Sequence, residues 1–240
     1  IILVDDEITT GISLLNLIKE IVKNSSVRKF SIMTILDWRN ESMKDNYRKY
    51  ISETGIEIYV YSLLSGYVFE ENTTIYKNKN VTHIEKTLDS ISLNIFSRQI
   101  VPTLENPCTK YVSYTGRFGI DYECINKVEV FSNKTANEVS NYLGTNKRIL
   151  ILGHGENIYI PSRVAFYLQN IGYEVSFRTT SRTPIYCDGE IIKDVQTFDD
   201  RGVIYHFYNR EEAEKYDKVI MLADTPFNKM ICNNLMIFNL

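Results

Sequence analysis

The chain has 240 residues, of which 44% are hydrophobic and 24% are charged, a balance typical of a globular protein with a buried core. A formal net charge of −3 gives no basic surface for the phosphates of nucleic acid, and no apolar run reaches the roughly 18 residues of a membrane span. We therefore expect neither a nucleic-acid partner nor a membrane partner.

Cysteine and histidine are few and far apart in this sequence. Four cysteines without C-x-x-C spacing, and three histidines without ligand spacing, predict free thiols in the cytoplasm and no metal site. Asp5, Asp6 and Glu7 interrupt the apolar stretch near the start, so we expect no signal peptide. The chain begins inside an apolar strand without Met, and we expect it to be a fragment that lacks an upstream part.

The first third of the chain alternates strand and helix patterns. Residues 1–4 form an apolar run, which predicts a strand buried on both faces of a parallel sheet. Residues 5–11 predict a polar loop, and apolar residues at helical spacing predict a helix over 12–22. A strand at 30–36, a helix at 40–54 and a strand at 56–64 follow. This order is that of βαβ units with right-handed crossovers.

The middle of the chain predicts a change of domain. Residues 72–80 are polar and rich in turn formers, which indicates a loop or hairpin, and residues 83–101 predict one amphipathic helix closed by a proline. Residues 103–107 indicate a linker. We therefore predict two domains, 1–102 and 108–240.

The second half of the chain also alternates predicted strands and helices. The predicted elements are helices at 135–143 and 162–170 and strands at 149–152, 173–178, 203–208 and 218–222. The predicted fold class is α/β, with a parallel-sheet portion followed by a second α/β domain.

The loop after the first strand carries the strongest functional signal. Backbone N–H groups at a helix start form an anion cradle, and Gly11 removes the Cβ that would obstruct it. Thr9 and Thr10 add hydroxyl groups, while Asp5 and Asp6 bring carboxylates to the carboxyl end of a parallel strand, where ligands of open α/β sheets bind. Ribose 5-phosphate, with a phosphate and vicinal hydroxyls, fits this combination.

Residues 4–11, Val-Asp-Asp-Glu-Ile-Thr-Thr-Gly, resemble the phosphoribosyl-pyrophosphate motif of type I phosphoribosyltransferases. The resemblance implies that Asp5 and Asp6 act in catalysis by contacting the ribose hydroxyls. It assigns substrate binding to Glu7, Ile8, Thr9, Thr10 and Gly11, with the phosphate held by the last four. It further implies an unidentified acceptor and a Mg²⁺ ion chelated mainly by the pyrophosphate. That family places a pyrophosphate loop and a catalytic loop before the motif, so we expect this chain to be inactive alone.

Other interpretations compete with this one. A strand end and helix cap would leave the two threonines before a glycine unexplained. A phospho-acceptor receiver domain also opens with Asp-Asp-Glu, but Asp37 comes too early to be its acceptor and no Lys-Pro pair follows where expected. Trp38 either stacks on a planar acceptor or packs at a domain edge. A non-catalytic ribose-phosphate sensor or partner-binding subunit remains the alternative function.

A second group of candidate residues follows two later strands. Two glycines after the strand at 149–152 let a backbone approach a ligand, and four hydroxyls surround one arginine within residues 179–184. The candidate ligand-binding residues are Gly153, His154, Gly155, Glu156, Ser181, Arg182 and Thr183. The alternative is a hydroxyl-rich loop whose arginine pairs with an acid such as Asp188.

These segments resemble the TRSP domain, named for Thr-Arg-Ser-Pro, which follows a phosphoribosyltransferase-like domain in bacterial tellurite-resistance-associated clusters. This chain has Ser-Arg-Thr-Pro at 181–184, and residues 116–119, with Arg117, resemble another segment of that domain. The resemblance implies a role in making a nucleoside-like molecule. We also consider a second phosphorylated or ribosyl ligand in this domain, and leave a homodimer open.

Overall fold

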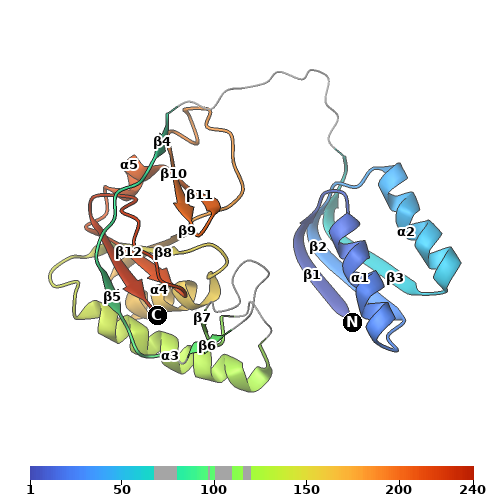
Figure 1. The fold of residues 1–240 in the computed structure, drawn as a ribbon, viewed down its shortest axis with the longest axis horizontal. Helices are drawn as coiled ribbons and strands as arrows, with labels where there is room; N and C mark the ends of the chain where they lie inside the picture. Colours follow the sequence, from blue (N-terminus) through green and yellow to red (C-terminus); the bar gives the residue numbers. More distant parts are fainter. Residues whose placement is uncertain (68–79, 97, 101–109, 116–119) are drawn as a thin grey trace. The chain divides into compact units, whose positions relative to one another are not determined.

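The computed structural model describes residues 1–240 except 68–79, 97, 101–109 and 116–119 (Figure 1). The chain divides into two compact units, Ile1–Ile75 and Tyr76–Leu240. No helix in the described part of the chain is both long and apolar enough to cross a membrane.

The first unit is a three-stranded parallel sheet with two helices. Its elements are β1 (Ile2–Ile8), α1 (Ile12–Asn24), β2 (Lys29–Asp37), α2 (Glu41–Thr54) and β3 (Glu57–Ser65). The strand order is β1-β2-β3, which confirms the predicted βαβ units. The predicted loop at 5–11 is too long, because the acidic residues 5–7 belong to β1 and Asp5 pairs with Thr34 of β2.

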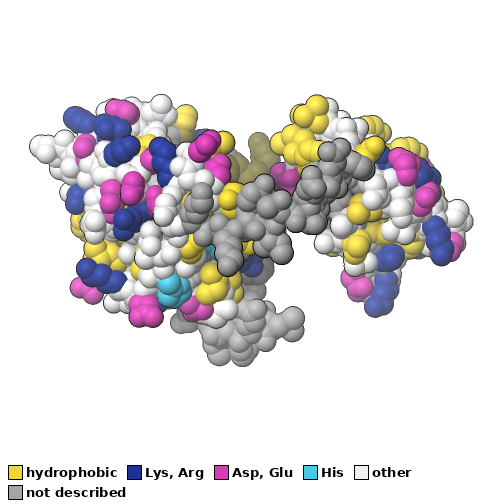
Figure 2. Space-filling view, turned by 90° about the horizontal axis from the view of Figure 1, so that it is seen from above, with side chains coloured by type: hydrophobic (Ala, Val, Ile, Leu, Met, Phe, Trp, Pro, Cys, Tyr) yellow, Lys and Arg dark blue, Asp and Glu magenta, His cyan; other side chains and the backbone are white. Residues whose placement is uncertain are grey.

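The core of this unit lies on one face of the sheet. Both crossovers place their helices on that face, and Phe30 and Ile32 of β2 pack there against Ile18 of α1 (Figure 1). The prediction that residues 1–4 are buried on both faces is wrong, since Val4 is 77% exposed. Figure 2 shows hydrophobic side chains gathered on part of this unit's surface (right).

The second unit contains the remaining elements. Its strands are β4 (Val81–His83), β5 (Ser90–Ser92), β6 (Arg98–Ile100), β7 (Lys110–Val112), β8 (Arg148–Gly153), β9 (Glu174–Thr179), β10 (Val195–Asp200), β11 (Val203–Tyr208), β12 (Lys218–Ala223) and β13 (Leu235–Asn239). Its helices are α3 (Tyr122–Ser140), α4 (Tyr159–Asn170) and α5 (Arg210–Ala213). The main sheet is parallel with the order β5-β13-β12-β8-β9, and a smaller sheet has the order β11-β10-β4.

Both faces of the main sheet are covered. Helices α3 and α4 pack on one face, against alternate residues such as Ile149 and Ile151. Strands β10 and β11, with α5, cover the other face, where Leu150 and Leu152 point. This double burial explains why β8 and β12 are continuous apolar runs in the sequence and why both strands were predicted.

The predicted helix at 83–101 does not form. Its described residues contain β5, β6 and the end of β4, which pair with β13, β7 and β10. Strands β4, β5 and β6 belong to the second compact unit, and the predicted domains 1–102 and 108–240 stay predictions. Residues 72–79 of the predicted loop and the predicted linker at 103–107 lie outside the described residues.

Candidate functional site

The loop between β1 and α1 has the geometry of an anion cradle. Gly11 precedes the helix with φ of 74°, in the left-handed region, and no side chain caps the helix. Thr9 and Thr10 are exposed, and the only hydrogen bond recorded for their hydroxyl groups among the described residues is a long one, 3.4 Å, from the Ile12 N–H to Thr10 Oγ1. The first-turn N–H groups of α1 and the positive end of its dipole are therefore presented at this loop.

Protein side chains fill the space beneath Gly11. The Tyr47 hydroxyl donates a hydrogen bond of 2.6 Å to the Gly11 carbonyl oxygen. The Arg39 guanidinium lies over the Tyr47 ring, 4.5 Å from its centre. A Cβ on residue 11 would stand 2.9 Å from both Arg39 Cδ and Tyr47 Oη, so close packing as well as the positive φ requires glycine here.

A buried ion pair fixes Arg39 in this position. Its Nε and Nη2 donate hydrogen bonds of 2.9 and 2.8 Å to the two carboxylate oxygens of Asp37. The side chains are only 4% and 6% exposed, and the hydrogen bonds from Arg39 lower the pKa of Asp37. Trp38, between them, is half-buried and donates its backbone N–H to the Ile8 carbonyl oxygen.

Three exposed carboxylates lead into the loop. Asp5 Oδ1 accepts the Asp6 N–H at 3.1 Å, and Asp6 Oδ1 accepts the Glu7 N–H at 3.0 Å. Partial burial raises the pKa of Asp5, and the charges of Asp6 and Glu7 add to this. Because successive side chains of a strand alternate between faces, Asp5 and Asp6 leave β1 on opposite sides.

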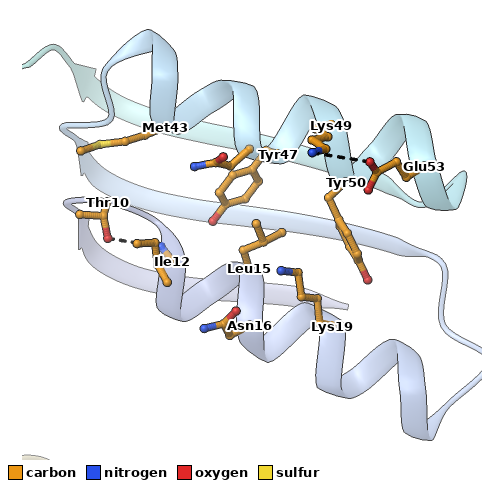
Figure 3. A pocket seen from close by; sticks show the side chains of 11 residues that line it. Thr10, Ile12, Leu15, Asn16, Lys19, Met43, Tyr47, Lys49, Tyr50 and Glu53 are labelled. Carbon is orange, nitrogen blue, oxygen red and sulfur yellow. Dashed lines mark hydrogen bonds and ion pairs between the residues drawn. The ribbon is translucent and has the colours of Figure 1, made fainter.

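A groove of about 340 Å³ between α1 and α2 adjoins this loop. Figure 3 shows Thr10 at one end of the groove, with Leu15 and Tyr47 along its floor. Lys19 lines it near the other end, with its ammonium 5.5 Å from the centre of the Tyr50 ring. The surface that continues from the loop is thus polar and carries positive charge.

The second group of predicted residues meets at the carboxyl ends of β8 and β9. Both ring nitrogens of His154 are engaged there, since Nδ1 lies 3.0 Å from Thr180 Oγ1 and Nε2 lies 3.0 Å from Asp200 Oδ2. The ring packs between Tyr205 and Phe227, each 4.5 Å away, and His154 is 1% exposed. In this arrangement His154 joins elements of its own domain and offers no ring nitrogen to a ligand.

The two glycines of the β8 loop are also required by internal contacts. A Cβ on residue 153 would overlap the Asn157 carbonyl oxygen, and one on Gly155 would lie 3.1 Å from the Tyr205 ring. The close neighbours of both glycines in the structure are thus protein atoms, and their part in binding a ligand stays a prediction. Sequence reasoning missed Asp200 and Tyr205 because they come from the β10–β11 hairpin, far along the chain.

The arginine of the β9 loop has an acidic partner. Arg182 forms an ion pair with Glu156, and both side chains are about half exposed. Asp188, the alternative partner, instead accepts backbone N–H groups of residues 190–192. Ser181 pairs through its backbone with His206, and its Oγ accepts the Thr183 N–H at 3.0 Å. The structure thus brings the predicted loops together, while Arg117 lies outside the described residues.

Metal-binding side chains do not gather in the described ranges: no three His, Cys, Asp or Glu residues there lie close enough to hold an ion together. Cys124 and Cys232 carry free thiols, the Cys187 thiol donates a hydrogen bond of 3.0 Å to the Ile192 carbonyl oxygen, and Cys108 falls outside these ranges.

Comparison with protein families gives two matches. A model described as a phosphoribosyl transferase matches residues 1–67, and a model described as the TRSP domain C-terminal to that transferase matches residues 114–237. Comparisons with curated proteins and with solved structures gave no match. The two matches stand in the order that the sequence motifs predicted.

Proposed function

Because this chain belongs to the family in which a TRSP domain follows a phosphoribosyl transferase domain, we propose that its first unit binds phosphoribosyl pyrophosphate for transfer of the 5-phosphoribosyl group to an acceptor. The observation that carries the proposal is the turn at Gly11, held in the left-handed region at the start of α1 by Tyr47 and Arg39. This turn presents first-turn N–H groups and two exposed threonines to one point, as a phosphate requires.

The ribose would lie against the carboxylates of β1. Asp5 and Asp6 would accept hydrogen bonds from its 2- and 3-hydroxyls, and their negative charge would stabilise the positive charge that develops on the ribose as pyrophosphate leaves. Their alternation across the strand means that each would meet the sugar from a different side. Mg²⁺ would enter as part of the substrate, bound mainly by the pyrophosphate, where it neutralises the charge of the leaving group.

The order of the two domains supports a place in the cytoplasmic synthesis of a ribosylated, nucleoside-like molecule. The acceptor would then reach the reacting carbon from beyond the carboxyl ends of β2 and β3, where Trp38 offers a flat aromatic surface.

Calorimetric titration of phosphoribosyl pyrophosphate with Mg²⁺ into the whole chain tests the proposal. We expect Asp5→Asn and Asp6→Asn each to weaken binding about tenfold, because each removes a charged hydrogen-bond acceptor. Glu138→Gln, an exposed carboxylate on α3 of the other unit, is the matched control and should leave binding unchanged.

The outcomes separate the proposal from its alternative. Absence of binding by the unaltered chain would contradict the proposed site. Binding without release of pyrophosphate when candidate acceptors are supplied would favour the non-catalytic sensor over the transferase.

A further inference from the structure

A second cavity, in the other unit, lies beside the small sheet and the start of α5. Its volume is about 250 Å³, and it is formed by β4 and the residues after it, by β10, by the start of α5 and by residues 230–233. Backbone hydrogen bonds hold these segments together, among them Met230 N–H to the Lys86 carbonyl oxygen at 2.9 Å. The cavity is therefore a built feature of the fold, formed by residues far apart in the chain.

Gln196 of β10 lines this cavity with an unused amide. The residue is 3% exposed, and its side-chain amide makes no hydrogen bond within the described part of the protein. An amide in such a position is available to form a hydrogen bond with a group that enters the cavity. Its alternate neighbour Phe198 lies in the core between the two sheets, so β10 directs Gln196 into the same layer.

Arg210 is the second unsatisfied group. Its Nε is buried and has no hydrogen-bond partner among the described residues. The nearest carboxylate oxygen, Oε1 of Glu214, stands 3.9 Å away and already accepts hydrogen bonds from the backbone and side chain of Asn233. The Arg210 side chain is 38% exposed and stands beside Glu214, and its buried Nε–H is available to donate a hydrogen bond to a planar or tetrahedral oxyanion.

Charged side chains of both signs surround the cavity, with the Glu214 carboxylate close to Arg210 and Cys232. Lys86 and Arg210 line it, with His83, whose Nδ1 lies 3.1 Å from Thr197 Oγ1. Glu85 is the only carboxylate side chain in the lining. Burial raises the pKa of the Cys232 thiol, also in the lining, to about 12, so that this group stays neutral at physiological pH.

We propose that this cavity binds the oxyanion group, carboxylate or phosphate, of a small metabolite, with Arg210 and Gln196 as its hydrogen-bond donors. The site lies within the second unit and does not depend on the function proposed for the first. Its volume, just below the usual range for ligand pockets, limits the bound group to a small one.

Side-chain ¹H–¹⁵N spectra of the whole chain test the proposal at the site itself. Arg210→Lys and Gln196→Leu assign the Arg210 Nε and Gln196 Nε2 signals by their loss. The unaltered chain is then titrated at constant ionic strength with sodium acetate, inorganic phosphate and ribose 5-phosphate, and with sodium chloride as a blank. We expect both signals to shift and saturate together with at least one oxyanion.

Comparison of the titrations with different anions identifies which oxyanion group binds. Saturation with acetate alone assigns a carboxylate ligand, and saturation with phosphate or ribose 5-phosphate assigns a phosphate ligand. Arg210→Gln should weaken that binding about tenfold to a hundredfold, whereas Arg148→Gln, an exposed arginine outside the cavity, should not change it. If neither signal shifts at about 10 mM of any oxyanion, or if chloride shifts them equally, the proposal is wrong.

Discussion

Gly11 is the residue on which the proposed phosphate site depends most. Replacement by alanine would put a Cβ into Arg39 and Tyr47 and would force a positive φ on a residue that disfavours it. We expect Gly11→Ala to lower the free energy of unfolding by at least about 1–2 kcal/mol and to remove binding of ribose 5-phosphate, both measured on the purified chain.

Gly66→Ala is the control for this substitution. Gly66 has no atoms within 4 Å of an added Cβ and does not adopt a positive φ, so stability and binding should stay as they are. Equal binding by the Gly11→Ala variant and the unaltered chain would show that the turn does not hold the phosphate.

The ion pair beneath the loop predicts a pH dependence of stability. The hydrogen bonds from Arg39 lower the pKa of Asp37 in the folded state, so the pair contributes fully above the ordinary pKa of about 3.9 and is lost as pH falls through the lower folded-state value. Asp37→Asn leaves Arg39 buried without its partner, at a cost of about 3 kcal/mol.

Thermal unfolding between pH 3 and pH 8 measures this effect. The difference in Tm between the unaltered chain and Asp37→Asn should be constant above about pH 5 and should shrink below about pH 4. Asp45→Asn, an exposed carboxylate on α2, supplies the baseline. A difference as large at pH 3 as at pH 7 would rule out ionisation of Asp37 as its cause.

At the scale of elements, β2 shows which face of the first sheet carries the core. Ile32 is fully buried against the helices, whereas Ile35, three residues later, is 53% exposed on the opposite face. We expect Ile32→Ala to lower the free energy of unfolding by about 2–5 kcal/mol and Ile35→Ala by less than about 0.5 kcal/mol, in denaturant titrations. Equal costs would mean that the second face is also packed.

Helices and strands whose sequence pattern lies within their own segment could be predicted from the sequence. The first unit's strands and helices were predicted because their apolar periodicity and flanking turns lie within each segment. Strands β4 and β5 gave no such signal, because each has three residues and pairs with a strand more than a hundred residues away. Because the strands are short and the apolar residues around them are loosely spaced, the pattern of residues 83–101 predicted an amphipathic helix instead.

The candidate site shows the same difference between features that lie within one segment and features that depend on distant segments. The Thr9–Thr10–Gly11 loop could be predicted because its chemistry lies in adjacent residues. Its support from Tyr47 and Arg39 could not, since these come from α2 and from the loop after β2, and only packing brings them beneath Gly11. The motif predicts which atoms face a ligand, while the tertiary structure determines what holds them there.

On the scale of the whole molecule, the two compact units have separate cores. Among the described residues, the hydrophobic cluster of the first unit shares no member with the two clusters of the second. We expect calorimetry to show two unfolding transitions, with Ile32→Ala lowering the Tm of one and Ile151→Ala lowering that of the other, because each removes packing from one core only. If both variants shift the same transition, the units unfold together.

The position of β13 in the main sheet sets the order in which the protein matures on the ribosome. β13 lies between β5 and β12 in the sheet. The hydrogen bonds between β5 and β13 therefore cannot form until Ile237, the partner of Ser90, has been synthesised. At the usual rate of about 5–20 residues per second, that wait lasts roughly 7 to 30 seconds. During this interval the strands of the first unit have already been made, and the apolar strand β8 is made before its neighbour β12. Chaperones should therefore be needed chiefly by nascent chains that end between β8 and β13, and ribosome-bound chains stalled at successive lengths would reveal that window.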